Sequence, residues 1–353
     1  MKAAFLYGPY DIKVEEMPVP KIGSREVLVE MKACGVCGTD IEKMHGGFIT
    51  PPKLGHEVTG KVIEIGDEVK NVQAGDRVFV HHHVPCYKCH HCRHGDYTMC
   101  EEFPKTNLDP CGYAQYFRVP EPNVERGAIL KLPSHISFEA GTLIEPAACC
   151  IRGLNKSRLA VGDDVLVIGA GPIGLTMVDL LRLYGASTII VSEIVDYRMK
   201  AARHFGADYA VNPTEEDLRN KVREITNGRG TDLVVVAVGG SKGIVQGIDC
   251  VRKGGQVILF GAPPRGDILS YDASKIFINE VKITPSYSTT EIETAAALKL
   301  MGNNKINVRK LITHIFPLTD TLNAIKFAAE SKEALKVIIR PEINSHQQIP
   351  DTI

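Results

Sequence analysis

Residues 163–193 read DDVLVIGAGPIGLTMVDLLRLYGASTIIVSE, and this stretch decides the fold. It opens with a continuous apolar run, turns through glycines spaced as G-x-G-x-x-G, and continues in a helical pattern. A second apolar, β-branched run ends at Glu193, 19 residues after Gly174. The glycine turn follows a predicted strand and begins a predicted helix, and an acidic residue stands at the end of the next strand. This combination indicates dinucleotide binding. We therefore predict a dinucleotide-binding domain here.

The residue types of the turn suit this chemistry. Gly169, Gly171 and Gly174 permit a tight turn and a close approach of the pyrophosphate to the N-terminus of the following helix. Glu193 is expected to accept hydrogen bonds from the hydroxyls of the adenosine ribose. The same carboxylate would repel a 2′-phosphate, so the sequence predicts NAD as the cofactor in preference to NADP.

Strands and helices continue to alternate beyond this stretch. The apolar runs YAVN, DLVVVAV and QVILF are separated by helical stretches such as 214–226 and 241–253. This alternation predicts an α/β fold with a doubly wound parallel sheet. Ligands of such sheets bind beyond the carboxyl ends of the strands, where the sequence places Val238, Phe260 and Ala262. Packing in the core or in a loop is the alternative role for each of these three.

Length and charge exclude several classes of protein. At 353 residues the chain is longer than most single cores, so two domains are expected. Lys and Arg total 41 against 42 for Asp and Glu, which argues against nucleic-acid binders and polybasic membrane binders. The apolar runs are too short for a spanning helix, and the N-terminus is unlike a secretory signal. We expect a cytoplasmic protein that binds neither nucleic acid nor membranes.

A cysteine-rich segment, CYKCHHCRHGDYTMC, occupies residues 86–100. Cytosolic thiols are kept reduced, so clustered cysteines there are more often metal ligands than bridges. Four thiolates with two-residue gaps and one longer gap are typical of a closed, structural zinc site. An iron–sulfur cluster takes the same ligands, although familiar ferredoxin spacings differ, and the four cysteines could also be free or bridged. The predicted structural zinc ligands are Cys86, Cys89, Cys92 and Cys100.

A second candidate metal site lies upstream, in ACGVCGTD (33–40) and LGHEVTG (54–60). Cys37, His56 and Glu57 offer a thiolate, an imidazole and a carboxylate. This mixture suits a zinc ion with an open position, which can act as a Lewis acid on an oxygen. A chance co-occurrence of these residue types is the alternative.

Taken in order, these motifs resemble the zinc-containing medium-chain dehydrogenase/reductase family, in particular its alcohol and polyol dehydrogenases. The resemblance covers nearly the whole chain and is carried by CGVCGTD, GHEVTGKVIEIG, AGDRV, the four-cysteine lobe, IEPAACC and VLVIGAGPIG. It implies a GroES-like, β-rich catalytic domain at 1–147, a Rossmann domain at 148–286, and a return to the catalytic domain at 287–353. The strand-like runs EVLVEMKA, VTGKVIEIG, DRVFVH and YAQYFRVP agree with an all-β first part.

The resemblance also assigns roles at the catalytic zinc. Cys37 and His56 would hold the ion, with Glu57 and Glu145 as oxygen candidates. Glu145 lies in IEPAACC, where polyol dehydrogenases of this family carry glutamate and classical alcohol dehydrogenases carry a cysteine. Direct and water-mediated contact of either glutamate with the zinc both remain open.

Four residues near Cys37 are implied to act outside the ligand shell, the last two of them as alternatives. Asp40 would hydrogen-bond the zinc-bound imidazole and fix its tautomer. Thr39 would take the proton of the substrate. The relay of the family commonly ends at a histidine five residues after the metal cysteine, where this chain has Glu42. Either Glu42 with water or the nearby His45 would then deliver the proton to solvent.

The cofactor is implied to contact the glycine turn, the following acid and the residues beyond the strand ends. Arg198, five residues after Glu193, matches a basic residue that contacts the ribose in NAD-dependent members. The predicted cofactor-binding residues are Gly169, Gly171, Pro172, Ile173, Gly174, Glu193, Arg198, Val238, Phe260 and Ala262.

The implied activity is transfer of a hydride from a secondary alcohol, such as a sugar alcohol, to NAD+. One catalytic and one structural Zn²⁺ per chain would serve this reaction. L-Threonine 3-dehydrogenase activity is the enzymatic alternative, and a zinc- and nucleotide-binding protein without turnover is the alternative from another class. A small-molecule alcohol or polyol is the expected partner, and the expected assembly is a homotetramer or homodimer.

Overall fold

The structure is a computed structural model that describes residues 1–47 and 53–342. The chain divides into two compact units, one formed by residues 1–148 with the segment from Ser288 onward, the other by Cys149–Tyr287. Each unit has a hydrophobic core of its own. The polar tail at 343–353 lies outside the described residues. No helix among the described residues is both long and apolar enough to cross a membrane.

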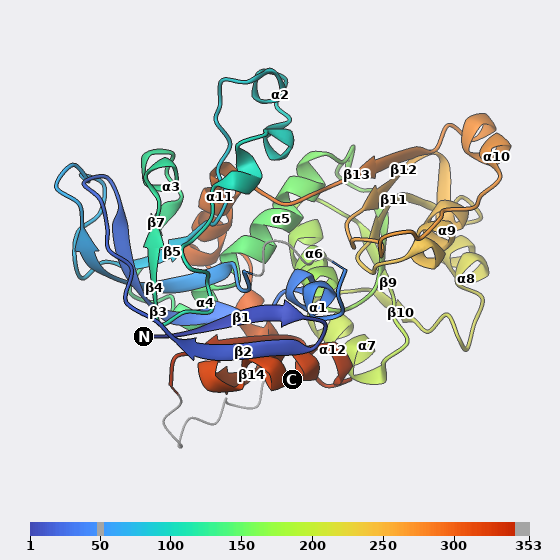
Figure 1. Cartoon of the computed structure of the whole chain (residues 1–353). Helices are drawn as coiled ribbons and strands as arrows, with labels where there is room; N and C mark the ends of the chain where they lie inside the picture. The colour runs from blue at the N-terminus through green and yellow to red at the C-terminus, as the bar shows by residue number, and fades with distance from the viewer. Residues whose placement is uncertain (48–52, 343–353) are drawn as a thin grey trace. The chain divides into compact units, whose positions relative to one another are not determined.

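The first unit is built on β-strands, as Figure 1 shows. Within the described residues, one sheet has the strand order β14-β15-β3-β4-β5-β7, with β6 also paired to β3, and β1 pairs with β2 separately. The strands are β1 (Lys2–Gly8), β2 (Asp11–Glu16), β3 (Val27–Gly35), β4 (Glu57–Ile65), β5 (Arg77–Val80), β6 (Tyr116–Val119), β7 (Ile129–Lys131), β14 (Ile312–Pro317) and β15 (Lys336–Arg340). The four strand-like runs of the sequence therefore form β3 to β6, which confirms the β-rich first part.

Short helices connect these strands. They are α1 (Gly38–Met44), α2 (His90–Arg93), α3 (Glu121–Glu125), α4 (Phe138–Gly141), α11 (Glu291–Gly302) and α12 (Thr321–Glu330). The helix α5 (Ile144–Asn155) begins in the first unit and continues into the second. The segment after Ser288 adds two strands, because β15 pairs with β3 in antiparallel register.

The second unit is a six-stranded parallel sheet in the order β10-β9-β8-β11-β12-β13. Its strands are β8 (Asp164–Ile168), β9 (Thr188–Ser192), β10 (Tyr209–Val211), β11 (Thr231–Val236), β12 (Val251–Leu259) and β13 (Lys282–Pro285). Its helices are α6 (Pro172–Leu183), α7 (Asp196–His204), α8 (Leu218–Ile225), α9 (Ser241–Cys250) and α10 (Ala273–Ile278). This arrangement confirms the doubly wound sheet.

Burial explains why the apolar runs of this unit are continuous. Val165, Leu166 and Val167 are fully buried in β8, which is typical of a parallel strand covered on both faces. After β8 the chain builds β9 and β10 on one side and then β11 on the other. The strand order therefore reverses at β8, and such a switch point is where a doubly wound sheet binds its ligand.

Two predicted helices are shorter in the structure than in the sequence pattern. The stretch 214–226 contains α8 only from Leu218, because the Asp217 side chain caps the helix by accepting from the N–H of Asn220. The stretch 241–253 contains α9 only to Cys250, because Val251 already begins β12. Capping and strand pairing thus set these ends.

A pair of substitutions tests the packing of the glycine turn. A Cβ at position 174 would overlap the carbonyl oxygen of Gly169, whereas a Cβ at position 171 would meet no atom within 4 Å. We expect Gly174→Ala to lower the free energy of unfolding by about 1–3 kcal/mol through overpacking, measured by urea denaturation. Gly171→Ala is the matched control and should leave the free energy of unfolding nearly unchanged. If both variants lose the same free energy of unfolding, this account of the turn is contradicted.

Candidate functional site

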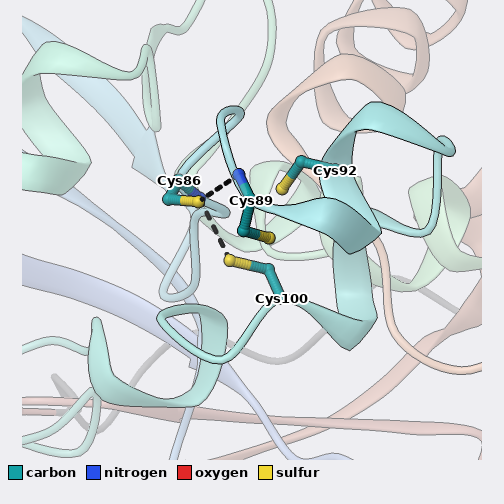
Figure 2. A group of neighbouring side chains, drawn as sticks. All are labelled: Cys86, Cys89, Cys92 and Cys100. Carbon is teal, nitrogen blue, oxygen red and sulfur yellow. Dashed lines mark hydrogen bonds between the residues drawn. The ribbon is translucent and has the colours of Figure 1, made fainter.

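The four-cysteine lobe gathers its sulfur atoms in one place (Figure 2). One Sγ atom from each of Cys86, Cys89, Cys92 and Cys100 lies within 4.8 Å of the others. The backbone N–H of Cys86 donates to Cys100 Sγ at 3.3 Å, and that of Cys89 donates to Cys86 Sγ at the same distance. These four sulfur atoms are close enough to share one tetrahedral ion.

The electrostatics of the lobe fit a cation. Backbone N–H groups, that of Lys88 foremost, lower the pKa of the Cys86 thiol to about 6, while burial raises that of Cys92 well above its usual range. Four deprotonated thiols in this space would repel one another without a positive ion between them. His90, His91 and His94 are exposed, in keeping with a site that the four sulfur atoms complete.

The upstream site is assembled by strand pairing. The antiparallel register of β3 and β4 sets Gly35 opposite Glu57. Cys37 follows the end of β3, so its sulfur reaches the start of β4, where His56 and Glu57 lie. One ligand atom from each of Cys37, His56 and Glu57 lies within 4.8 Å of the others. Glycine at 35 leaves room for the carboxylate of Glu57, because a Cβ there would overlap it.

Glu57 is held by a lysine that the sequence analysis did not identify. Lys336 Nζ lies 2.5 Å from Glu57 Oε2 and donates to the carbonyl oxygen of Val36 at 2.9 Å. The two side chains are 4% and 1% exposed, so this ion pair is buried. Burial alone would lower the pKa of Lys336, but Glu57 and then Cys37 raise it above its usual value. The sequence carried a signal for this ion pair, because Lys336 begins the apolar run KVIIR and is therefore expected to be buried. Buried lysines are almost always paired with an acid.

The charges around His56 fit a metal ion. Burial would lower the pKa of this imidazole, but Cys37, through its charge and a hydrogen bond, and then Asp40 and Glu145 raise it to about 10. Such a site strongly favours a positive charge, which a proton or a metal ion can supply. The donor types and their spacing are those of a zinc site with an open position.

Glu145 lies near this site but outside the group of three ligand atoms. It is buried in the first turn of α5, and its charge raises the pKa of both His56 and Lys336. The close group of ligand atoms among the described residues therefore contains Glu57 and not Glu145.

Asp40 makes different contacts from those expected. Its carboxylate accepts from the backbone N–H of Cys37 at 3.1 Å, from that of Gly55 at 3.0 Å and from the Tyr113 hydroxyl at 2.9 Å. No hydrogen bond from His56 to Asp40 is found among the residues that the structure describes. These contacts fix the backbone at Cys37 and just before His56.

The three expected relay residues lie on or next to α1. Thr39 is exposed, and its Oγ1 is 3.7 Å from Cys37 Sγ. Glu42 is half-buried on the same helix. His45 caps the end of α1, with its ring centroid 5.5 Å from that of Tyr10.

A run of three histidines at the end of β5 also belongs to this site, and the sequence analysis missed it. The ring centroid of His82 lies 4.9 Å from that of His56. His81 Nε2 lies 3.3 Å from the Thr289 carbonyl oxygen, and His83 Nδ1 hydrogen-bonds that of Thr106. The signal in the sequence was the string HHH directly after an apolar strand.

Burial keeps these three rings neutral. It lowers the pKa of His81 to about 3, that of His83 to about 4, and that of His82 well below its usual value. Among the described residues, the buried Nδ1 atom of His82 has no hydrogen-bond partner. A buried polar atom without a partner costs about 1–3 kcal/mol, so it calls for a ligand or water as its partner.

The second unit presents the predicted dinucleotide turn. Gly169 has a φ of +96°, which favours glycine, and a Cβ there would also overlap Val238. Gly171 is the N-cap of α6, and Pro172 and Ile173 form its first turn. Proline suits this position because the first N–H groups of a helix have no intrahelical partner.

Glu193 is tied into this turn. Its Oε2 accepts from the N–H of Ala170 at 2.8 Å, and its Oε1 accepts from those of Ile194 and Val195 at 2.8 and 3.0 Å. The residue is 8% exposed. It therefore already supports the loop, in addition to the ribose contact expected of it.

The other predicted cofactor residues follow the ends of neighbouring strands. Val238 follows β11, Phe260 and Ala262 follow β12, and Arg198 lies on α7. Val238 packs beside Gly169, and the Ala262 carbonyl approaches Gly239. Phe260 packs beside Gly153, a packing role that the sequence analysis left open.

The lobe can be tested by one conservative substitution. Cys92→Ser should remove one of four ligands, so the variant should lose one metal ion per chain and unfold at a lower temperature. Metal analysis and thermal denaturation measure the two effects. Cys250→Ser, at a buried cysteine of the other unit, is the control and should keep its metal content. An unchanged metal content in Cys92→Ser would exclude the structural site.

Comparison with known proteins agrees with both units. The model of the alcohol dehydrogenase GroES-like domain matches residues 23–134, and that of the zinc-binding dehydrogenase domain matches residues 172–303. Sorbitol dehydrogenase of Bacillus subtilis is 30% identical over 350 residues, 97% of each chain. L-Threonine 3-dehydrogenase of Pyrococcus horikoshii is 35% identical over 314 residues, 86% of this chain and 88% of that one.

A solved structure is similar over nearly the whole length. A zinc-binding dehydrogenase from Sinorhizobium meliloti, bound to NADP, has a TM-score of 0.87 and 28% identity, covering 96% of this chain and 99% of that one. With the matches to both domains and the relatives at 30% identity or above, these findings establish that the chain belongs to the zinc-containing medium-chain dehydrogenase/reductase family.

Proposed function

We propose that this alcohol dehydrogenase-type oxidoreductase transfers a hydride from a secondary hydroxyl of a polyol to NAD+, giving a ketone. The observation that carries the proposal is the donor set of Cys37, His56 and Glu57 within 4.8 Å. A thiolate, an imidazole and a carboxylate can hold zinc and leave a position for an oxygen. Sorbitol dehydrogenase among the relatives supports the substrate class.

Different residues of the chain would bind the zinc and transfer the proton. Cys37 and His56 would hold the zinc, and Glu57, anchored by Lys336, would supply the oxygen ligand, with Glu145 as the second carboxylate. Zinc, when bound, supplies Lewis-acid polarisation of the substrate oxygen. Thr39 accepts the hydroxyl proton, and Glu42 with water passes it to solvent. His45 is less suited to this step because its ring packs on Tyr10.

The neutral histidines favour a polyol. His82 Nδ1 is buried beside His56 and has no hydrogen-bond partner within the described part of the chain, so it suits a second hydroxyl of the substrate, which can donate or accept as the tautomer requires. L-Threonine carries an ammonium and a carboxylate, and neutral imidazoles provide no charge for either. The P. horikoshii relative nevertheless makes L-threonine 3-dehydrogenase the second candidate. A protein without turnover is the third, and the intact donor set argues against it.

NAD is the proposed cofactor because Glu193 lies where the adenosine ribose is expected. The carboxylate accepts three backbone N–H groups, which hold it in place with its negative charge at the end of β9. A 2′-phosphate would meet that charge. Arg198 five residues later suits the ribose hydroxyls.

A substrate panel tests the activity and the role of His82 together. The wild-type enzyme should oxidise polyols with NAD+ at higher kcat/KM than L-threonine or 2-propanol. His82→Leu should lower kcat/KM for the polyol about 10- to 100-fold by leaving a substrate hydroxyl unpaired, with little effect on 2-propanol. Equal losses on both alcohols would exclude the contact with a second hydroxyl.

The control for this panel is a variant that lacks a ligand of the proposed catalytic zinc. Cys37→Ala should abolish turnover of every alcohol while NAD+ binding, followed by calorimetry, survives, because the dinucleotide turn belongs to the other unit. Turnover retained in Cys37→Ala would exclude the zinc mechanism.

Cofactor choice is tested with Glu193→Gln. Glutamine keeps one oxygen for the backbone N–H groups of the turn and loses the negative charge together with the second acceptor, so kcat/KM with NADP+ should rise relative to that with NAD+. Adding Arg198→Ala should reverse the gain, because Arg198, five residues after Glu193, is the basic residue expected to contact a 2′-phosphate. If the wild-type enzyme already prefers NADP+, the proposed role of Glu193 is wrong.

A further inference from the structure

The second unit contains a cavity that the proposed reaction does not use. Its volume is about 560 Å³, within the range of small-molecule sites. It lies at the starts of β11 and β12, since Gly228 and Arg229 precede β11 and Val251 begins β12. The dinucleotide turn follows the end of the parallel strand β8. The cavity is therefore at the opposite edge of the sheet from the dinucleotide turn.

Six cationic side chains line this cavity. They come from α8, from the segment before β11, from the start of β12 and from α10, so they converge from four separate parts of the unit. They are Arg219, Arg223, Arg229, Arg252, Lys253 and Lys275.

Protein carboxylates neutralise only part of this charge. Arg229 pairs with Asp164 at 2.6 Å, and Arg252 pairs with Asp232 at 2.5 Å. The one acid in the lining, Asp249, accepts a hydrogen bond from the Tyr271 hydroxyl at 2.7 Å. The remaining four cations take part in none of the ion pairs found among residues 1–47 and 53–342: Arg219, Arg223, Lys253 and Lys275.

The helix α8 adds a local argument. Arg219 and Arg223 are four residues apart, so they lie on one face of the helix. Like charges at this spacing destabilise a helix by about 0.2–0.5 kcal/mol. An anion between them reverses the sign of this interaction, because guanidinium groups form paired hydrogen bonds with phosphoryl oxygens.

We propose that this cavity is a binding site for a small molecule that carries two or more phosphoryl groups. The cavity, at about 560 Å³, has room for more than one phosphoryl group, so a chain of them can contact α8 and β12 together. The near-zero net charge of the whole protein means that the attraction is local to this cavity, where walls of one sign focus the field. The site is separate from the dinucleotide turn and does not depend on the proposed function.

Calorimetric titration of the zinc-loaded enzyme with sodium tripolyphosphate, in the presence of saturating NAD+ and at constant ionic strength, tests this site. We expect one saturable site per chain, binding that weakens with added salt, and weaker binding of sulfate. Arg219→Ala/Arg223→Ala should weaken tripolyphosphate binding about tenfold or more, since each lost charged hydrogen bond is substantial. Alanine favours helix, so α8 should remain folded.

The control is Lys200→Ala/Arg203→Ala, on α7 of the same unit. This double variant also loses two positive charges, but at positions that do not line the cavity, so it should bind tripolyphosphate like the wild type. Chelation of zinc by the probe would affect both double variants equally. The site is excluded if the two double variants lose affinity equally, if NAD+ abolishes binding, or if the wild type shows no saturation. Equal affinity for sulfate would overturn the assignment to a molecule with several phosphoryl groups.

Discussion

The buried ion pair between Lys336 and Glu57 is the interaction on which the upstream site of the first unit depends. It joins a residue near the end of the chain to one of the three residues that offer close ligand atoms at the upstream site. A buried ion pair costs desolvation, but removal of one partner leaves an uncompensated charge that costs about 3–5 kcal/mol. The segment after Ser288 must therefore return to the first unit before the site is electrostatically complete, and the pairing of β15 with β3 brings Lys336 there.

In the remainder of the site, each of the closely spaced acidic side chains Asp40 and Glu57 has its own hydrogen-bond or ion-pair partner. The Asp40 carboxylate accepts hydrogen bonds from two backbone N–H groups and from the Tyr113 hydroxyl. These bonds stabilise its charge and hold the loops that carry Cys37 and His56. Glu57 is occupied by Lys336. The neutral histidines that follow β5 add hydrogen-bonding capacity without adding charge, because burial lowers their pKa. A site built in this way can attract a divalent cation and still offer uncharged contacts to an alcohol.

The nucleotide unit uses its two sheet edges differently. At the carboxyl ends of the strands, glycines and the buried carboxylate of Glu193 shape a turn around backbone N–H groups. At the starts of the strands, arginine and lysine side chains gather around a cavity. Both edges suit phosphoryl groups, but the first offers backbone dipoles at a helix N-terminus and the second offers full charges. One sheet can thus provide two kinds of anion recognition.

The sequence by itself determined the features that local pattern governs. The spacing of Gly169, Gly171 and Gly174 predicted the turn, the continuous apolar runs predicted the parallel sheet, and the cysteine spacing predicted that four sulfur atoms would meet, because each depends on neighbours within a few tens of residues. Only the tertiary structure decided which residues far apart in the chain complete the site. Lys336 reaches Glu57 through the pairing of β15 with β3, and Asp40 turned out to bind backbone N–H groups and Tyr113, because long-range strand register and burial, which no local pattern encodes, decide the partner of each buried charge.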